Sequence, residues 1–138
     1  RFDMTVWGDI LTLVAHRTGV AGTVIDGPCR DTALAMEIGY PLYSRSVSMR
    51  TGKDRVQLDE MNVRVSIGGA HVSPGDLMRG DADGVVVVPK AFEEAVLKTA
   101  EEIEVAENRI REAVQSGMRL DEARTANRYH ALQTREKA

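Results

Sequence analysis

A short apolar run between two helix-forming segments most constrains the fold of this chain. Residues 22–26 read Gly-Thr-Val-Ile-Asp, a length and composition typical of a buried strand. Residues 8–18 place apolar side chains at helical spacing, and residues 32–38 predict a second helix that ends at Gly39. Gly27-Pro28 predicts a turn between the strand and this second helix. This order of elements predicts an α/β fold.

The middle of the chain predicts further short strands. Residues 41–48 alternate in polarity and predict a strand, whereas residues 50–60 are polar and predict an exposed loop. Glycine-containing turns then separate four more strand candidates, at 62–67, 70–72, 76–79 and 84–88. The run Val85–Val88 is apolar on both faces, so we expect it at the centre of a sheet.

The last third of the chain predicts helices. Residues 90–115 carry apolar residues at helical spacing and predict a long amphipathic helix that ends at Ser116-Gly117. We therefore expect one compact α/β domain at residues 1–118 with a long C-terminal helix, followed by a polar helical tail at 119–138. The chain begins without Met and enters structure almost at once, so we expect that an N-terminal part is missing.

Composition argues against several classes of protein. Eighteen basic and twenty-one acidic residues give a net charge of −3, which offers no electrostatic case for a nucleic-acid partner. No apolar stretch is long enough to span a bilayer, so no membrane partner is expected. The single cysteine, Cys29, excludes an internal disulfide and favours a reducing compartment. These features predict a cytoplasmic protein.

Two acidic residues and a cation at fixed spacing form the candidate site. Twenty residues lie between Asp9 and Arg30, and Asp31 follows directly. Asp31 offers a hard oxygen ligand for Mg²⁺ or Mn²⁺, and Mg²⁺ needs only one or two protein carboxylates. Arg30 has the planar fork that binds a carboxylate, and the amides of residues 8–11 begin a helix, where anions bind. Asp9 would then orient a water for proton transfer.

Simpler interpretations of the same residues remain open at this point. Asp9 is favoured in a first helical turn by the helix dipole, Asp31 is a possible helix cap, and Arg30 is a possible surface residue. The three histidines show no zinc-binding spacing, so zinc is not expected. Spacing alone therefore does not decide between a structural and a catalytic role.

Several short segments between residue 7 and about residue 112 carry a family resemblance through their order and spacing. They are Gly8-Asp9-Ile10-Leu11, Gly22–Asp31, Gly39–Tyr43, Ile67-Gly68-Gly69, Val72–Leu77 and Gly80–Pro89. In this arrangement the chain resembles the RraA-like family. That family includes class II 4-hydroxy-4-methyl-2-oxoglutarate/4-carboxy-4-hydroxy-2-oxoadipate aldolases and the regulator of ribonuclease activity A.

The resemblance implies a role for each residue of the spacing motif. Asp31 would bind the divalent metal, Mg²⁺ or Mn²⁺, Arg30 would bind the pyruvyl group, and Asp9 would hold a water near the metal. The substrate-binding loop would be Gly8–Leu11, with the amide of Ile10 against pyruvate.

The resemblance also implies a fold and an assembly. The fold would be similar to the phosphohistidine swivelling β/α domain, in homotrimers or homohexamers with active sites between subunits. A Glu from the neighbouring subunit's C-terminal helix would complete the water network. Glu104 and Glu107 are the candidates, and Glu107 is preferred because Arg111 and Gly117 follow at similar spacing.

The function implied by the resemblance is metal-dependent cleavage of a 4-hydroxy-2-oxo acid to pyruvate. The metal and Arg30 would stabilise the enolate, and oxaloacetate decarboxylation would be a side activity because it passes through the same enolate. The alternative is a regulator that binds and inhibits a ribonuclease. The long helix at 90–115 favours the enzyme, since the regulator is shorter there.

Overall fold

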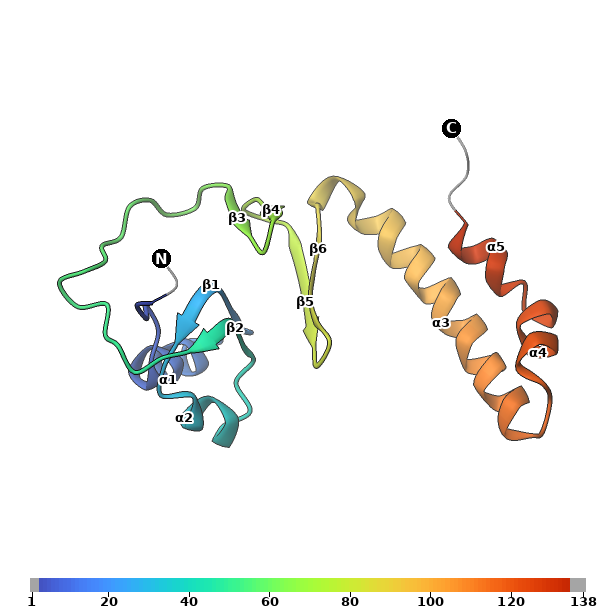
Figure 1. Ribbon diagram of the computed structural model, residues 1–138. Coiled ribbons are helices and arrows are strands. Elements are labelled where there is room, and N and C mark those ends of the chain that lie inside the picture. The colour runs from blue at the N-terminus through green and yellow to red at the C-terminus, as the bar shows by residue number, and fades with distance from the viewer. Residues whose placement is uncertain (1–2, 135–138) are drawn as a thin grey trace. The chain divides into compact units, whose positions relative to one another are not determined.

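The computed structural model describes residues 3–134 of the chain (Figure 1). Its contacts fall into two compact units, which divide between Pro89 and Lys90. We call residues 1–89 the N-terminal unit and residues 90–138 the C-terminal unit. The boundary predicted between residues 118 and 119 stays a prediction. By their contacts, residues 90–118 belong to the same unit as the segment that follows them.

Two helices and two parallel strands open the N-terminal unit (Figure 1). They are α1 (Asp9–Arg17), β1 (Thr23–Cys29), α2 (Thr32–Glu37) and β2 (Leu42–Val47). Their core contains Ala15, Ala35 and Tyr40, with Trp7, Ile38 and Leu42 packed against it. The predicted helix–strand–helix–strand order is confirmed, because the apolar spacing in each segment matches the face that it buries.

The predicted turn at Gly27-Pro28 is wrong. Both residues lie inside β1 and are buried, and the pairing of β1 with β2 shifts register between Ile25 and Pro28. Proline has no N–H to donate to a neighbouring strand, so an irregularity in the pairing accommodates it. β1 therefore runs to Cys29 and delivers Arg30 directly at its end.

Two antiparallel hairpins complete the N-terminal unit. The first joins β3 (Val65–Ile67) to β4 (Ala70–Val72), and the second joins β5 (Leu77–Asp81) to β6 (Gly84–Val88). Both glycines of the first turn, Gly68 and Gly69, have positive φ, as a tight two-residue turn requires. All four predicted strands are present: 70–72 and 84–88 have the predicted bounds, whereas the strands predicted at 62–67 and 76–79 have shifted bounds.

The predicted central position of Val85–Val88 is wrong. In the described part of the chain β6 pairs only with β5, in a two-stranded sheet. Val88 is buried, whereas Val86 is 56% exposed. A continuous apolar run is typical of a strand buried on both faces, but here Val85 and Val87 on one face are only half-buried, and on the other face only Val88 is buried.

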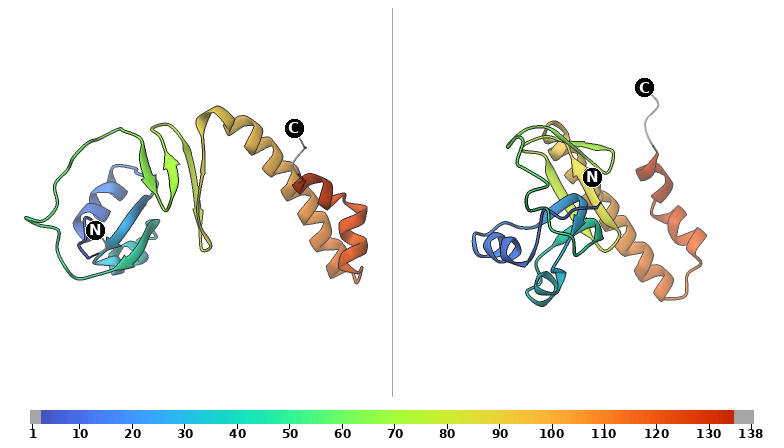
Figure 2. Two further views of the ribbon diagram at one scale, coloured as in Figure 1. Left: turned by 45° about the horizontal axis from the view of Figure 1, so that its top comes forward. Right: turned by 60° about the vertical axis from the view of Figure 1, so that its left-hand side comes forward.

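The C-terminal unit is helical. A 3₁₀ turn, η1 (Lys90–Phe92), leads into α3 (Glu93–Gln115), which confirms the long helix predicted at 90–115. α4 (Leu120–Ala126) and α5 (Tyr129–Gln133) run back along α3 (Figure 2). Residues 120–126 and 129–133 of the predicted tail are thus helical, and residues 135–138 lie outside the described residues.

The tail is anchored more firmly than its polarity indicates. Ala123 of α4 is fully buried, and Ala106 and Ile110 of α3 are also buried.

Within residues 3–134, no helix has the length and apolar character needed to cross a membrane.

Candidate functional site

A cleft of about 620 Å³ lies in the N-terminal unit, between the start of α1 and the segment 51–58. Gly8, Asp9, Ile10, Leu11 and Arg30 all line it. The predicted substrate-binding residues therefore meet at one concave surface. The rest of the lining is Thr5, Val6, Trp7, Thr51, Gly52, Lys53, Val56, Gln57 and Leu58.

A buried threonine fixes the first turn of α1. The Thr12 hydroxyl donates to the carbonyl of Gly8 at 3.0 Å and accepts a hydrogen bond from the Trp7 indole at 2.9 Å. Thr12 is only 1% exposed, so these bonds are shielded from water. Gly8 is the extended N-cap and carries no capping side chain. The helix start is thus held from inside while its outer face borders the cleft.

The amides at the start of α1 are not equivalent. The Ile10 amide donates to the Asp9 carboxylate at 2.8 Å, so the amide predicted to contact pyruvate has an acceptor already. The amides of Asp9 and Leu11 have no acceptor among residues 3–134. Free amides at a helix N-terminus favour an anion, so these two are the better donors to a carboxylate.

Arg30 and Asp31 are held beside this helix start. The Arg30 amide donates to the Trp7 carbonyl at 3.1 Å, which ties the end of β1 to the residues before α1. Arg30 Nε lies 3.4 Å from Asp31 Oδ2, and both side chains are somewhat under half exposed. A Cβ atom on Gly8 would lie 3.0 Å from that same Asp31 oxygen. The bare backbone of Gly8 therefore allows the Arg30–Asp31 pair to approach the cleft.

Asp31 does not cap α2 with its side chain. It occupies the N-cap position in a left-handed conformation, with φ 53, and its carboxylate makes no capping hydrogen bond. The interpretation of Asp31 as a side-chain cap is therefore wrong. Its carboxylate is left to Arg30 and to solvent.

The donor set around Asp31 bears on the choice of metal. Within residues 3–134, no group of three or more His, Cys, Asp or Glu side chains gathers as a metal site. Zinc usually takes three or four such protein ligands, whereas Mg²⁺ keeps several waters and uses one or two carboxylates. The residues present fit a hydrated Mg²⁺ or Mn²⁺ held through Asp31.

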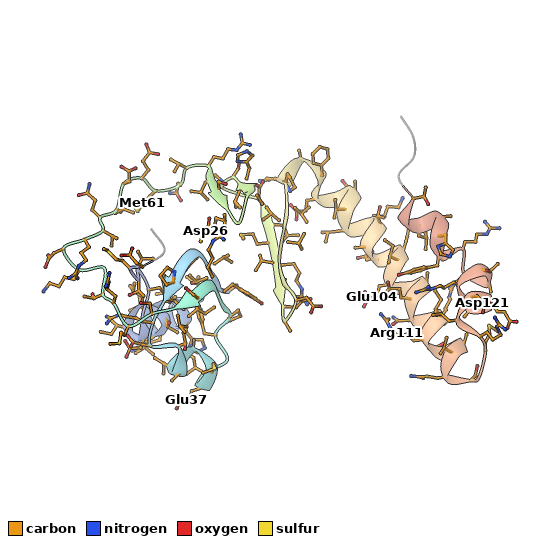
Figure 3. The ribbon with its side chains drawn as sticks, viewed as in Figure 1. Asp26, Glu37, Met61, Glu104, Arg111 and Asp121 are labelled. Atoms are coloured by element: carbon orange, nitrogen blue, oxygen red, sulfur yellow. The ribbon has the colours of Figure 1, made fainter. Side chains whose placement is uncertain are left out.

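The two candidate glutamates lie on α3, in the C-terminal unit. Glu107 is engaged at both carboxylate oxygens, by Arg111 at 2.7 Å and by the Tyr129 hydroxyl at 2.9 Å. Glu104, labelled in Figure 3, is exposed and has no hydrogen-bond or ion-pair partner among the described residues. The preference for Glu107 stays a prediction, and the contacts of Glu107 within its own unit weigh against it.

The segment 51–58 is a wall of the cleft that the sequence pattern does not reveal. Residues 50–60 are mostly exposed, as predicted, but six of them line the cleft. Gly52 is the one available signal. It is buried, and a Cβ atom there would lie 2.4 Å from the carbonyl oxygen of Thr5. A glycine inside a polar loop is consistent with such a close backbone approach.

Comparisons with known proteins agree on one family. A family model described as RraA-like, Aldolase/RraA, matches residues 2–87. A protein of Halalkalibacterium halodurans named as a proposed 4-hydroxy-4-methyl-2-oxoglutarate aldolase is 40% identical over 93 residues, which are 67% of this chain and 44% of that protein. The chain spans 20% to 57% of the length of the curated relatives that it matches.

Solved structures share the fold. An uncharacterized protein from Pseudomonas syringae pv. tomato is 45% identical, with a TM-score of 0.87 over 90% of this chain and 62% of the other. Streptomyces coelicolor RraAS2, described as an unusual member of the RNase ES inhibitor RraA protein family, is 32% identical. Its TM-score is 0.68, over 78% of this chain and 54% of the other.

Proposed function

The chain belongs to the RraA-like family, and from that premise we propose that it forms the catalytic core of a divalent-metal-dependent aldolase. The proposed reaction cleaves a 4-hydroxy-2-oxo acid to pyruvate and a second carbonyl compound. The observation that carries this proposal is the cleft shared by Asp9 and Arg30, with Asp31 paired to Arg30 beside it. The name of the H. halodurans relative supports the same reaction class.

Arg30 and the helix start would bind the pyruvyl end of the substrate. The guanidinium offers a charged, two-pronged donor, and the amides of Asp9 and Leu11 offer two more N–H groups. These donors would stabilise the negative charge that develops on the C2 oxygen when the C3–C4 bond breaks. Donors already directed at developing charge lower the barrier without further reorganisation.

Asp9 would take part in the two proton transfers of the reaction. The reaction removes a proton from the C4 hydroxyl, breaks the C3–C4 bond and returns a proton to C3, so the net proton balance is zero. A water held by the exposed Asp9 carboxylate would accept the first proton and deliver the second. A divalent cation on Asp31 would supply Lewis-acid polarisation of the substrate's oxygens.

Pyruvate release from 4-hydroxy-4-methyl-2-oxoglutarate tests this proposal. We expect release by the full-length protein with Mg²⁺ or Mn²⁺, loss of release with a chelator, and recovery when metal is added back. Oxaloacetate should also be decarboxylated, because it yields the same enolate. Release that a chelator leaves unchanged, or no release from any 4-hydroxy-2-oxo acid, would contradict the proposal.

Inhibition of a ribonuclease is the second candidate. The similarity to RraAS2 supports it, since that protein is placed in the RNase ES inhibitor RraA family. The length of α3 favours the enzyme instead, if the regulator is shorter in this region as the family resemblance implies. Slowed cleavage of RNA by a purified RNase E-type enzyme, together with no metal-dependent pyruvate release, would favour the inhibitor.

A further inference from the structure

The cleft is open and larger than a small 2-oxo acid requires. Its volume is about 620 Å³, within the range of pockets that enclose ligands much larger than pyruvate. In this conformation a bound pyruvyl group would share the cleft with water. Water weakens the interaction between a cation such as Arg30 and a developing negative charge. Movement of a segment into the cleft, with loss of that water, would therefore favour the proposed chemistry.

Exposed apolar side chains line both walls of the cleft. On the wall at the start of α1, Ile10 is 74% exposed and Leu11 is also exposed. On the opposite wall, segment 51–58, Leu58 is 72% exposed and Val56 is also exposed. Contact between the two walls would remove this apolar surface from water, and that removal is favourable roughly in proportion to the area lost.

Part of the second wall is not held in place. None of residues 57–63 makes a hydrogen bond or ion pair with any residue between 3 and 134, and all seven are exposed. We call residues 57–63 the strap. It belongs to the wide arch that joins β2 to β3 (Figure 1). The start of α1, by contrast, is fixed by the buried hydrogen bonds of Thr12. Closure would therefore move the strap and not the helix.

Both ends of the strap are anchored. Before it, the amides of Arg55 and Val56 donate to the carbonyl of Gly52 at 2.9 and 3.0 Å. After it, Val65 begins β3 and pairs with β4. Asn62, near the second anchor, has a positive φ of 58, a conformation that Asn tolerates better than most residues. The strap can thus rotate between fixed ends without breaking a hydrogen bond within residues 3–134.

The part of the strap that lines the cleft is uncharged. Gln57 and Leu58 belong to the lining, whereas the two carboxylates of the strap, Asp59 and Glu60, do not. Inward movement would therefore place an apolar side chain, and no carboxylate, at the mouth of the cleft. This arrangement suits an anionic ligand, because a carboxylate in that position would repel it.

We propose that the strap closes over the cleft when a 2-oxo acid binds, and that Leu58 packs against the start of α1 and excludes water. This inference rests on the proposed function in one respect, since it takes a 2-oxo acid as the ligand at Arg30. Closing loops of this kind shield reacting groups from water in many enzymes.

Hydrogen exchange with and without pyruvate tests the closure without requiring turnover. The full-length protein is titrated with pyruvate in the presence of Mg²⁺, and calorimetry establishes saturation. The amides of the strap have no protecting hydrogen bond from residues 3–134 in the open conformation. At saturation we expect them to exchange at least roughly fivefold more slowly, because closure shields them from solvent.

Leu58→Gln and Met61→Gln form a matched pair of variants. Both side chains lie on the strap and are 72% exposed, but only Leu58 lines the cleft; Met61 is labelled in Figure 3. Leu58→Gln should bind pyruvate roughly fivefold more weakly and leave the strap unprotected at saturation, because Gln replaces an apolar contact with a polar group. Met61→Gln should behave as wild type.

The outcomes separate closure of the strap from the aldolase reaction. Strap exchange that saturating pyruvate leaves unchanged would overturn the inference, and so would equal protection in the two variants. Absence of pyruvate binding would overturn it together with the proposed pyruvyl site. A protected strap in a protein that releases no pyruvate from any 4-hydroxy-2-oxo acid would support closure and count against the aldolase alone.

Discussion

At the residue scale, Asp31 has an unfavourable backbone conformation together with a carboxylate available for a ligand. Its φ of 53 lies in the left-handed region, which residues other than glycine rarely enter and which Asp and Asn tolerate best. The carboxylate contacts Arg30 and does not cap α2. Unfavourable backbone conformations of this kind often occur at functional positions.

Asp31→Asn separates these two properties. Asn tolerates the same backbone, so we expect the melting temperature to change by only about 1–2 °C. Pyruvate release should fall by about 100-fold or more, because the amide is a poor ligand for a hard divalent cation. A coupled pyruvate assay and a thermal unfolding curve measure the two effects.

Asp54→Asn is the matched control for that variant. Asp54 also has a positive φ, 61, and is exposed beside the cleft wall. We expect it to retain activity within about twofold, since it carries no proposed role. Equal losses in the two variants would mean that Asp31 has no special function.

Gly52→Ala should displace the cleft wall. The new methyl group would lie 2.4 Å from the Thr5 carbonyl oxygen, a contact that the backbone must move to relieve. We expect a loss of about 2 kcal/mol in unfolding free energy and weaker binding in the cleft. Gly22→Ala is the comparison, because its methyl group would meet Pro41 at 3.1 Å and should cost less. Urea unfolding of both variants measures the difference, and a Gly52→Ala protein as stable as wild type would contradict the close approach.

At the element scale, β1 shows which features of a strand a sequence pattern predicts and which it does not. The apolar run at 22–26 predicts the strand because burial imposes a local pattern of side chains. The same run does not reveal that Gly27-Pro28 continues the strand, because that depends on pairing with β2 across a register shift. Similarly, the spacing of Asp9 and Arg30 predicts the candidate site. The cleft wall at residues 51–58 could not be predicted, because it is positioned by contacts with Thr5, far away in sequence.

An ion pair across β1 and β2 predicts a pH dependence of stability. Arg45 donates a hydrogen bond to Asp26, labelled in Figure 3, and this bond is the main cause that lowers the pKa of Asp26 below its ordinary value of 3.8. The backbone at Gly68 lowers it further. A carboxyl group with a lowered folded-state pKa stabilises the protein above its unfolded-state value, and this contribution is lost as the pH falls through the folded-state pKa.

Asp26→Asn should therefore be less stable than wild type at pH 6, and the difference should shrink below pH 3.8. Urea unfolding at a series of pH values measures the difference in unfolding free energy. A difference that stays constant down to pH 2.5, well below the ordinary value, would show that the ion pair is not its source.

In the C-terminal unit, we expect a hydrogen bond between α5 and α3 to affect stability locally. The Tyr129 hydroxyl of α5 donates to Glu107 of α3 at 2.9 Å, and Arg124 of α4 lies 5.6 Å from the Tyr129 ring centre. Tyr129→Phe keeps the ring and removes the hydroxyl, so we expect a loss of about 1 kcal/mol. Hydrogen exchange should become faster in α5 while α1 is unchanged. Uniform acceleration in both helices would mean that the bond does not act locally.

At the scale of the whole molecule, most residues of the proposed chemistry lie in the N-terminal unit. One residue of it, the predicted glutamate, lies outside that unit. The cleft, Asp9, Arg30 and Asp31 all belong to residues 1–89. The glutamate expected from a neighbouring subunit lies on α3 and belongs to the other unit. A single sequence could not decide between Glu104 and Glu107, because the expected contact is one between chains.

The central claim is that Arg30 and a divalent cation on Asp31 stabilise the enolate of pyruvate while Asp9 serves its proton transfer, and exchange of the methyl protons of pyruvate tests it most directly. The measurement follows loss of the methyl proton signal by NMR in D₂O, and it does not depend on the distal group of the substrate. We predict Mg²⁺- or Mn²⁺-dependent exchange with the full-length protein, and its loss in Asp9→Asn and Asp31→Asn. Exchange no faster than in buffer, or equally fast in those variants, would contradict the account.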